Sequence, residues 1–128
     1  MWLMTTVGFV SPSAEHTGGV RLLYNLSLPS CLLTHSNTAM AVRFRDGGAQ
    51  TDWITVRLKE YNPTTGMTYT RMSFNSNSFE SSNNWQEGWI TSSFDFDPYK
   101  VYYLEAELHR VSLTPPPPIL CCIRLWRY

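Results

Sequence analysis

Apolar and polar side chains alternate with a period of two along most of this chain, and this limits the folds open to it. Successive side chains of a β-strand point to opposite faces, so strict alternation predicts strands with one buried face. In residues 100–110 one face carries Tyr102, Leu104, Ala106 and Leu108. No stretch combines a period of 3.6 with helix-capping residues. The sequence therefore predicts an all-β protein.

Similar alternation predicts the other strands. They are expected over residues 20–28, 39–45, 52–61, 67–74, 87–94 and 119–126, with residues 2–10 as a further candidate. In the last strand one face would carry Ile119, Cys121, Ile123 and Leu125. Its other face, with Leu120, is also largely apolar, which favours a central or an interface strand.

One hairpin is predicted in detail. The segment Asn62-Pro63-Thr64-Thr65-Gly66 joins two alternating stretches. Proline presets a negative φ and glycine supplies a positive one, so these residues favour a turn. Residues 52–61 and 67–74 therefore form a β-hairpin, followed by a polar loop over residues 75–84.

Seven to eight short strands separated by turn signals are typical of an antiparallel β-sandwich, here of the jelly-roll kind. A length of 128 residues fits one domain, residues 1–128, in which residues 1–19 could form an N-terminal arm. The first basic residue is Arg21, so the N-terminus lacks the charged segment of a signal peptide.

The charge composition excludes several classes of function. Ten basic residues balance ten acidic ones, and only 16% of residues are charged. A nucleic-acid-binding protein needs a basic surface, and a membrane span needs about 18 apolar residues in a row. We therefore expect neither nucleic acid nor a membrane as a partner.

The cysteines and carboxylates give no strong site. Cys31, Cys121 and Cys122 are expected to be reduced thiols, with a bridge from Cys31 to either of the others as the alternative. No metal-ligand spacing occurs, and no metal or cofactor is expected. Asp95 and Asp97 could contribute to a calcium site, but carboxylates that accept backbone N–H groups in a turn are the favoured interpretation.

Known catalytic motifs are missing, so no catalytic residue and no enzyme activity are predicted. Glu105 and Glu107 share a strand face at about 7 Å, a spacing that paired glycosidase carboxylates also use. Charged residues that keep an edge strand soluble are the favoured interpretation.

The aromatic residues are the better lead. Trp53, Tyr61 and Tyr69 have the parity opposite to the predicted core. A second group, beside the polar loop, contains Asn83, Asn84, Trp85, Gln86 and Trp89. Three interpretations remain: packing in a second core, a protein interface, or stacking on sugar rings with amides taking the hydroxyls.

Arginine outnumbers lysine by eight to two, and arginine with aromatic residues is enriched at protein interfaces. The candidate ligand-binding residues are Trp53, Trp85, Trp89, Asn83, Asn84 and Gln86. The candidate interface residues are Tyr61, Tyr69, Arg124, Trp126 and Tyr128.

Residues 38–128 also carry a resemblance to a known kind of module. Ile54-Thr55-Val56-Arg57-Leu58 with Thr65-Gly66, the run from Tyr102 to Leu108, and Ile123-Arg124-Leu125 resemble small β-sandwich modules of bacterial and phage surface proteins. The resemblance implies a non-catalytic surface or assembly role and transfers no functional residue.

The leading hypothesis is therefore a structural or assembly module, such as a virion capsid, decoration or fibre protein or another homo-oligomeric subunit. Its partners would be copies of itself or other structural proteins, in a virion or cell-surface assembly. The alternative is a carbohydrate-binding module that uses exposed tryptophans to bind glycans.

Overall fold

The computed structural model describes residues 2–11, 17–26, 37–47, 51–111, 113 and 116–128. The strands are β1 (Trp2–Val10), β2 (Gly18–Asn25), β3 (Thr38–Asp46), β4 (Asp52–Tyr61), β5 (Thr68–Asn75), β6 (Ser82–Ser92), β7 (Val101–Arg110) and β8 (Ile119–Arg127). A short 3-10 helix, η2 (Ser76–Ser78), precedes β6. The predicted all-β class and strand number are confirmed, although β6 begins earlier than expected.

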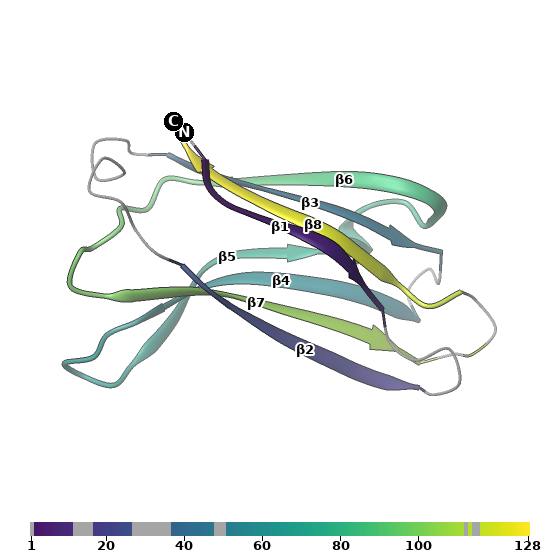
Figure 1. The fold of residues 1–128 in the computed structure, drawn as a ribbon, viewed down its shortest axis with the longest axis horizontal. Helices are drawn as coiled ribbons and strands as arrows, with labels where there is room; N and C mark the ends of the chain where they lie inside the picture. The colour runs from purple at the N-terminus through teal and green to yellow at the C-terminus, as the bar shows by residue number, and fades with distance from the viewer. Residues whose placement is uncertain (1, 12–16, 27–36, 48–50, 112, 114–115) are drawn as a thin grey trace.

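The strands form two antiparallel sheets that face one another, ordered β1-β8-β3-β6 and β2-β7-β4-β5 (Figure 1). Within them β4 pairs with β5, β3 with β6, β2 with β7 and β1 with β8. The chain is thus one long antiparallel ribbon, doubled back at residues 62–67 and rolled into two layers. This is the predicted jelly-roll sandwich.

The turn at the centre of this ribbon is built as its sequence predicts. The Asn62 side-chain oxygen accepts the N–H of Thr64 at 2.9 Å, and the Gly66 N–H donates to the Asn62 carbonyl at 2.8 Å. Gly66 has a φ of +73°, which glycine adopts without a steric penalty. The predicted hairpin is confirmed.

The core lies between the two sheets and follows the predicted alternation. Its buried side chains are Met40, Val42, Phe44, Ile54, Val56, Leu58, Met72, Phe74, Phe96, Tyr102, Leu104, Ala106, Leu108, Leu120, Ile123 and Leu125. Leu22, Tyr24 and Leu26 pack against it as expected. Residues 27–36, with Leu28 and Cys31, lie outside the described residues.

A β-bulge corrects the predicted face of the last strand. Arg43 pairs with Cys122 and Phe44 with Leu120, so Cys121 is an extra residue without a partner on β3. The bulge shifts the alternation by one residue. Leu120 therefore joins Ile123 and Leu125 in the core, whereas Ile119 and Cys121, predicted to share their face, are half-buried. The predicted central position is confirmed, because β8 lies between β1 and β3.

A second bulge corrects the predicted relation between Tyr61 and Tyr69. Leu58 pairs with Met72 but Lys59 pairs with Thr70, so Arg71 is the extra residue of β5. Tyr69 consequently pairs with Glu60, and residues directly opposite one another share a face. Tyr69 therefore lies on the face opposite to that of Tyr61.

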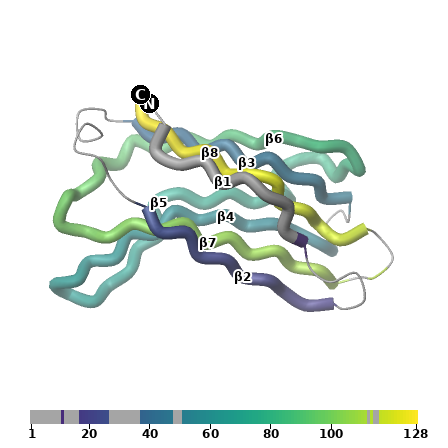
Figure 2. Tube along the Cα trace, viewed as in Figure 1, coloured from purple at the N-terminus to yellow at the C-terminus, as the bar shows by residue number. Residues whose placement is uncertain are grey.

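The chain's first strand takes part in a sheet. β1 pairs with β8 from Trp2, opposite Trp126, to Val10, opposite Leu120. This pairing gives β8 a neighbour on each side. Figure 2 shows β8 and β3 side by side in one layer and β7 and β4 side by side in the other.

A buried ion-pair cluster closes the hairpin end of the core. The Glu60 carboxylate accepts hydrogen bonds from Arg71 at 2.6 Å, Tyr102 Oη at 2.7 Å and Lys100 at 3.3 Å. Burial by itself raises the pKa of Glu60, but these three donors outweigh it and lower the pKa to about 2. Burial also raises the pKa of Tyr102, which stays a neutral donor.

We expect Glu60 to make the fold acid-sensitive. Because its folded pKa of about 2 lies below its ordinary value of 4.5, its contribution is complete above pH 4.5. That contribution, of order 3 kcal/mol, is lost as the pH falls from 4.5 towards 2. Urea unfolding at a series of pH values should show a shallower loss of stability in Glu60→Gln than in the wild type. If the free energy of unfolding fell equally steeply with pH in the wild type and in Glu60→Gln, this expectation would be wrong.

Gly88 of β6 should tolerate no side chain. A Cβ there would lie 2.5 Å from Cε2 of Phe74 and 2.6 Å from Cζ of Phe79, two stacked rings of the packed interior. We expect Gly88→Ala to destabilise the protein by about 1–3 kcal/mol, measured by thermal unfolding. Gly19→Ala is the matched control, since its Cβ meets nothing closer than 3.5 Å.

Candidate functional site

Two outer sheet surfaces carry the candidate residues, and the first lies over β8, β3 and β6. Register places Ala41 beside both Trp89 and Arg124, and Arg43 beside Glu87. Side chains of this parity point away from the core. The tryptophan face, as we call it, comprises Arg43, Arg45, Trp85, Glu87, Trp89, Arg124 and Trp126.

Trp89 and Trp126 come from strands on either side of β3 and meet above it. Their ring centroids are 5.1 Å apart at 85°, an edge-to-face contact. Between them β3 carries only Ala39 and Ala41, both 1% exposed, so small side chains leave the space into which the rings lean. Trp126 is half-buried, whereas 57% of Trp89 is exposed.

Arginines lie beside Trp85, the third tryptophan of this face. The guanidinium carbons of Arg43 and Arg45 lie 5.9 and 5.3 Å from the centre of the Trp85 ring, within range of a cation–π interaction. Arg124 forms an ion pair with Glu87. The face therefore combines aromatic surface with guanidinium groups that are already held in position.

The predicted ligand-binding residues are divided by the structure. Trp85 and Trp89 share the tryptophan face, and the exposed Asn83 and Asn84 precede them at the start of β6. Gln86 pairs with Phe44 instead, and its side chain donates to the Glu80 carbonyl at 2.8 Å. Trp53, in β4, belongs to the other sheet.

The predicted interface residues are divided as well. Arg124 and Trp126 belong to the tryptophan face. Tyr61 and Tyr69, 37% and 44% exposed, lie at the β4–β5 hairpin. Tyr128 follows β8, where its backbone exchanges hydrogen bonds with Asn37 at 3.0 and 3.2 Å.

The second surface is the outer face of β2, β7 and β4. Glu105 is 5% exposed, forms an ion pair with Arg21, and lies 3.5 Å from Arg57. Burial raises the pKa of Glu105, but the hydrogen bond from Arg21 and the positive charges of Arg21, Lys59 and Arg57 together outweigh it and leave the pKa lowered. The expectation of an edge strand here is wrong, because β7 lies between β2 and β4.

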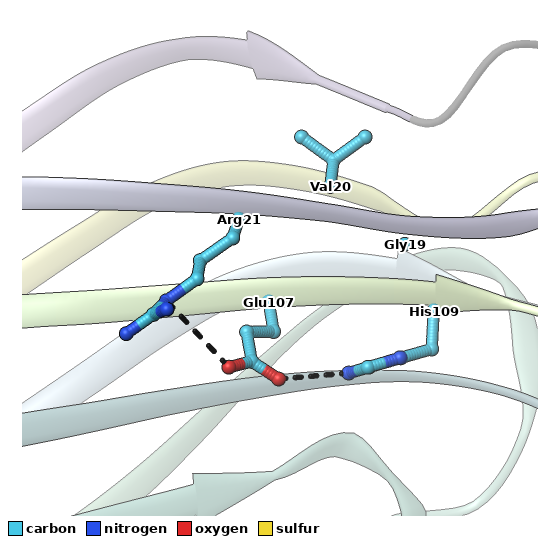
Figure 3. A pocket seen from close by; sticks show the side chains of 5 residues that line it. All are labelled: Gly19, Val20, Arg21, Glu107 and His109. Carbon is cyan, nitrogen blue, oxygen red and sulfur yellow. Dashed lines mark hydrogen bonds and ion pairs between the residues drawn. The ribbon is translucent and has the colours of Figure 1, made fainter.

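On the same surface His109 and Trp53 stack with centroids 4.6 Å apart and an interplanar angle of 18°. Nε2 of His109 lies 3.0 Å from the Glu107 carboxylate. Beside them is an open depression lined by Gly19, Val20, Arg21, Glu107 and His109 (Figure 3).

The remaining predicted sites have local explanations. The Asp97 carboxylate accepts the Tyr99 N–H at 2.9 Å, the turn arrangement expected from the sequence. Asp95 lies 3.7 Å from Arg127. Cys121 and Cys122 are free and half-buried, and burial raises the pKa of Cys122. Within the described ranges no three ligand-type side chains gather into a metal site, and no helix is long and apolar enough to cross a membrane.

Sequence reasoning missed Arg43, Arg45 and Glu87 as members of the tryptophan face. Their parity along each strand was visible, but their grouping depends on β3 pairing with both β6 and β8. Nothing local in the sequence specifies those two pairings, which join segments far apart in the chain.

No protein-family model and no curated protein matches this sequence. Among solved structures, the carbohydrate-binding module CBM6cm-2 of Cellvibrio mixtus lichenase 5A, in complex with cellotriose, has a TM-score of 0.55 at 10% identity, covering 100% of this chain and 99% of that one. A chain of the naturally occurring empty particles of cowpea mosaic virus has a TM-score of 0.52 at 10% identity, covering 100% and 86%.

The CBM22-1–GH10 modules of Clostridium thermocellum xylanase 10B, complexed with xylohexaose, give a TM-score of 0.53 at 8% identity. This chain is covered completely there, but only 29% of that chain is. Identities this low establish the fold alone. The matches therefore confirm the predicted resemblance to small β-sandwich modules as a resemblance of fold.

The exposure of Trp89 can be checked in solution. Because Trp89 is 57% exposed while Trp53, Trp85 and Trp126 are half-buried, we expect acrylamide to quench the fluorescence of Trp89 more readily than that of these three. Trp89→Phe should therefore lower the quenching constant of the protein more than Trp53→Phe does. Equal effects of the two substitutions would contradict the exposure difference.

Proposed function

We propose that this chain is a non-catalytic structural module that associates with copies of itself through the tryptophan face. The observation that carries the proposal is Trp89, a large aromatic side chain that stays 57% exposed while packed edge-to-face on Trp126. Trp and Arg dominate the residues whose truncation costs most at protein interfaces. A virion or cell-surface assembly is the setting that we propose for it.

Preorganisation of the face also supports the proposal. Arg124 is held by Glu87, and Arg43 and Arg45 lie close to the Trp85 ring. Side chains that are already positioned lose less conformational entropy when a partner binds. The fold shared with a chain of the cowpea mosaic virus particles is compatible with an assembly role.

Sedimentation velocity tests the proposal. We expect the wild type to form dimers or larger species in a concentration-dependent way. Trp89→Ala should weaken association by about 30-fold, the effect of losing roughly 2 kcal/mol at an interface hot spot. Tyr99→Ala, which removes an 86% exposed aromatic ring between β6 and β7 and outside the tryptophan face, is the control and should leave association unchanged.

Two results would overturn self-association through this face. One is a monomeric wild type at every accessible concentration. The other is association that Tyr99→Ala weakens as much as Trp89→Ala. Circular dichroism and thermal unfolding of both variants exclude misfolding as the cause.

A further inference from the structure

The depression on the outer face of β2, β7 and β4 lies in the sheet opposite to the tryptophan face, so self-association would leave it open. Its shape follows from one row of side chains across three strands. His109 of β7 pairs with Gly19 of β2 on one side and with Trp53 of β4 on the other.

The two neighbours of His109 differ in size, and this difference forms the depression. Trp53 covers one face of the imidazole by stacking on it. Gly19, on the other side, has no side chain, and a Cβ there would lie 3.5 Å from Nδ1 of His109. The imidazole therefore keeps an uncovered side above Gly19, held rigidly by the tryptophan behind it.

The polar groups around this ring are arranged to meet hydroxyl groups. When Nε2 of His109 donates to Glu107, the neutral ring keeps Nδ1, on the Gly19 side, as an acceptor. Oε1 of Glu107 lies 3.9 Å from both Arg21 and Arg57, beyond hydrogen-bond distance, so it can accept another donor. Arg21, whose side chain is 62% exposed, adds N–H donors (Figure 3).

The ion-paired charges beside the depression balance, whereas Lys59 lies further along the same face of β4. Glu105 and Glu107 face Arg21 and Arg57 in one connected set of ion pairs. A cation would be repelled by the two guanidinium groups, and an anion by the two carboxylates. A neutral ligand with several hydroxyl groups avoids both repulsions, and its hydroxyls can donate to the carboxylates and accept from the guanidinium groups.

We propose that this depression binds one ring of a neutral carbohydrate. The apolar face of the sugar would pack on the uncovered side of His109 above Gly19, while its hydroxyls donate to Nδ1 and Glu107 and accept from Arg21. The depression has a volume of about 260 Å³, just below the range of roughly 300–1,000 Å³ for drug-sized ligands. It therefore has room for a single ring of a longer glycan.

The test is an NMR titration of the labelled full chain with two neutral probes, cellotriose and xylohexaose, and with inorganic phosphate as a charged comparison. We expect at least one oligosaccharide, at millimolar concentration, to shift the His109 imidazole and Trp53 indole signals, and phosphate to leave them in place. Neither oligosaccharide shifting these signals would overturn the proposal.

Variants then locate the site. Gly19→Val fills the depression and should weaken binding at least tenfold, and Glu107→Gln, which removes the charged acceptor, should weaken it about tenfold. The second variant keeps the test decisive if the first fails to fold. Unchanged affinity in Glu107→Gln, or in a folded Gly19→Val, would overturn the proposal.

Trp89→Ala is the matched control on the tryptophan face. It should weaken self-association and leave sugar binding unchanged. Folded Gly19→Val should weaken sugar binding and leave self-association unchanged. Loss of sugar binding in Trp89→Ala alone would move the sugar site to the tryptophan face and overturn this assignment. The two proposals can therefore fail separately.

Discussion

The nested antiparallel pairing of the chain about its 62–66 turn is the constraint on which the rest of the structure depends. Once β4 and β5 pair across that turn, the outer pairs β3–β6, β2–β7 and β1–β8 continue the same ribbon. Rolling this ribbon brings β7 against β4 and β8 against β3. Both candidate surfaces arise from these pairings between distant segments: the tryptophan face from β6, β3 and β8, and the depression from β2, β7 and β4.

Small residues on central or flanking strands shape both outer faces. On the tryptophan face, Ala39 and Ala41 let Trp89 and Trp126 converge over β3. On the other face, Gly19 leaves the imidazole of His109 uncovered on one side. Small side chains therefore allow two aromatic rings to meet on one sheet and leave a depression on the other. The aromatic rings belong to the surface that we propose for self-association, and the depression is the site that we propose for a small hydroxylated ring.

The scarcity of charge has a structural explanation as well. Several of the few carboxylates are committed to ion pairs, notably Glu60 with Arg71 and Lys100, and Glu105 with Arg21 and Arg57. These pairs hold the hairpin end of the core and the outer face of β7. The charged residues of the tryptophan face are engaged as well, because Arg124 pairs with Glu87 and both Arg43 and Arg45 lie against the Trp85 ring.

The sequence by itself determined the strands, most of the core and the central hairpin, because period-two alternation and the chemistry of Asn62 and Gly66 are local properties. It did not determine the bulges at Arg71 and Cys121, which exist only relative to a partner strand. Those bulges separated Tyr69 from Tyr61 and moved Leu120 into the core. Only the tertiary structure decided that Trp85, Trp89 and Trp126 share one face, while Trp53 stacks on His109 on the outer face of the other sheet. Strand order is a property of long-range pairing, so no local pattern could specify it.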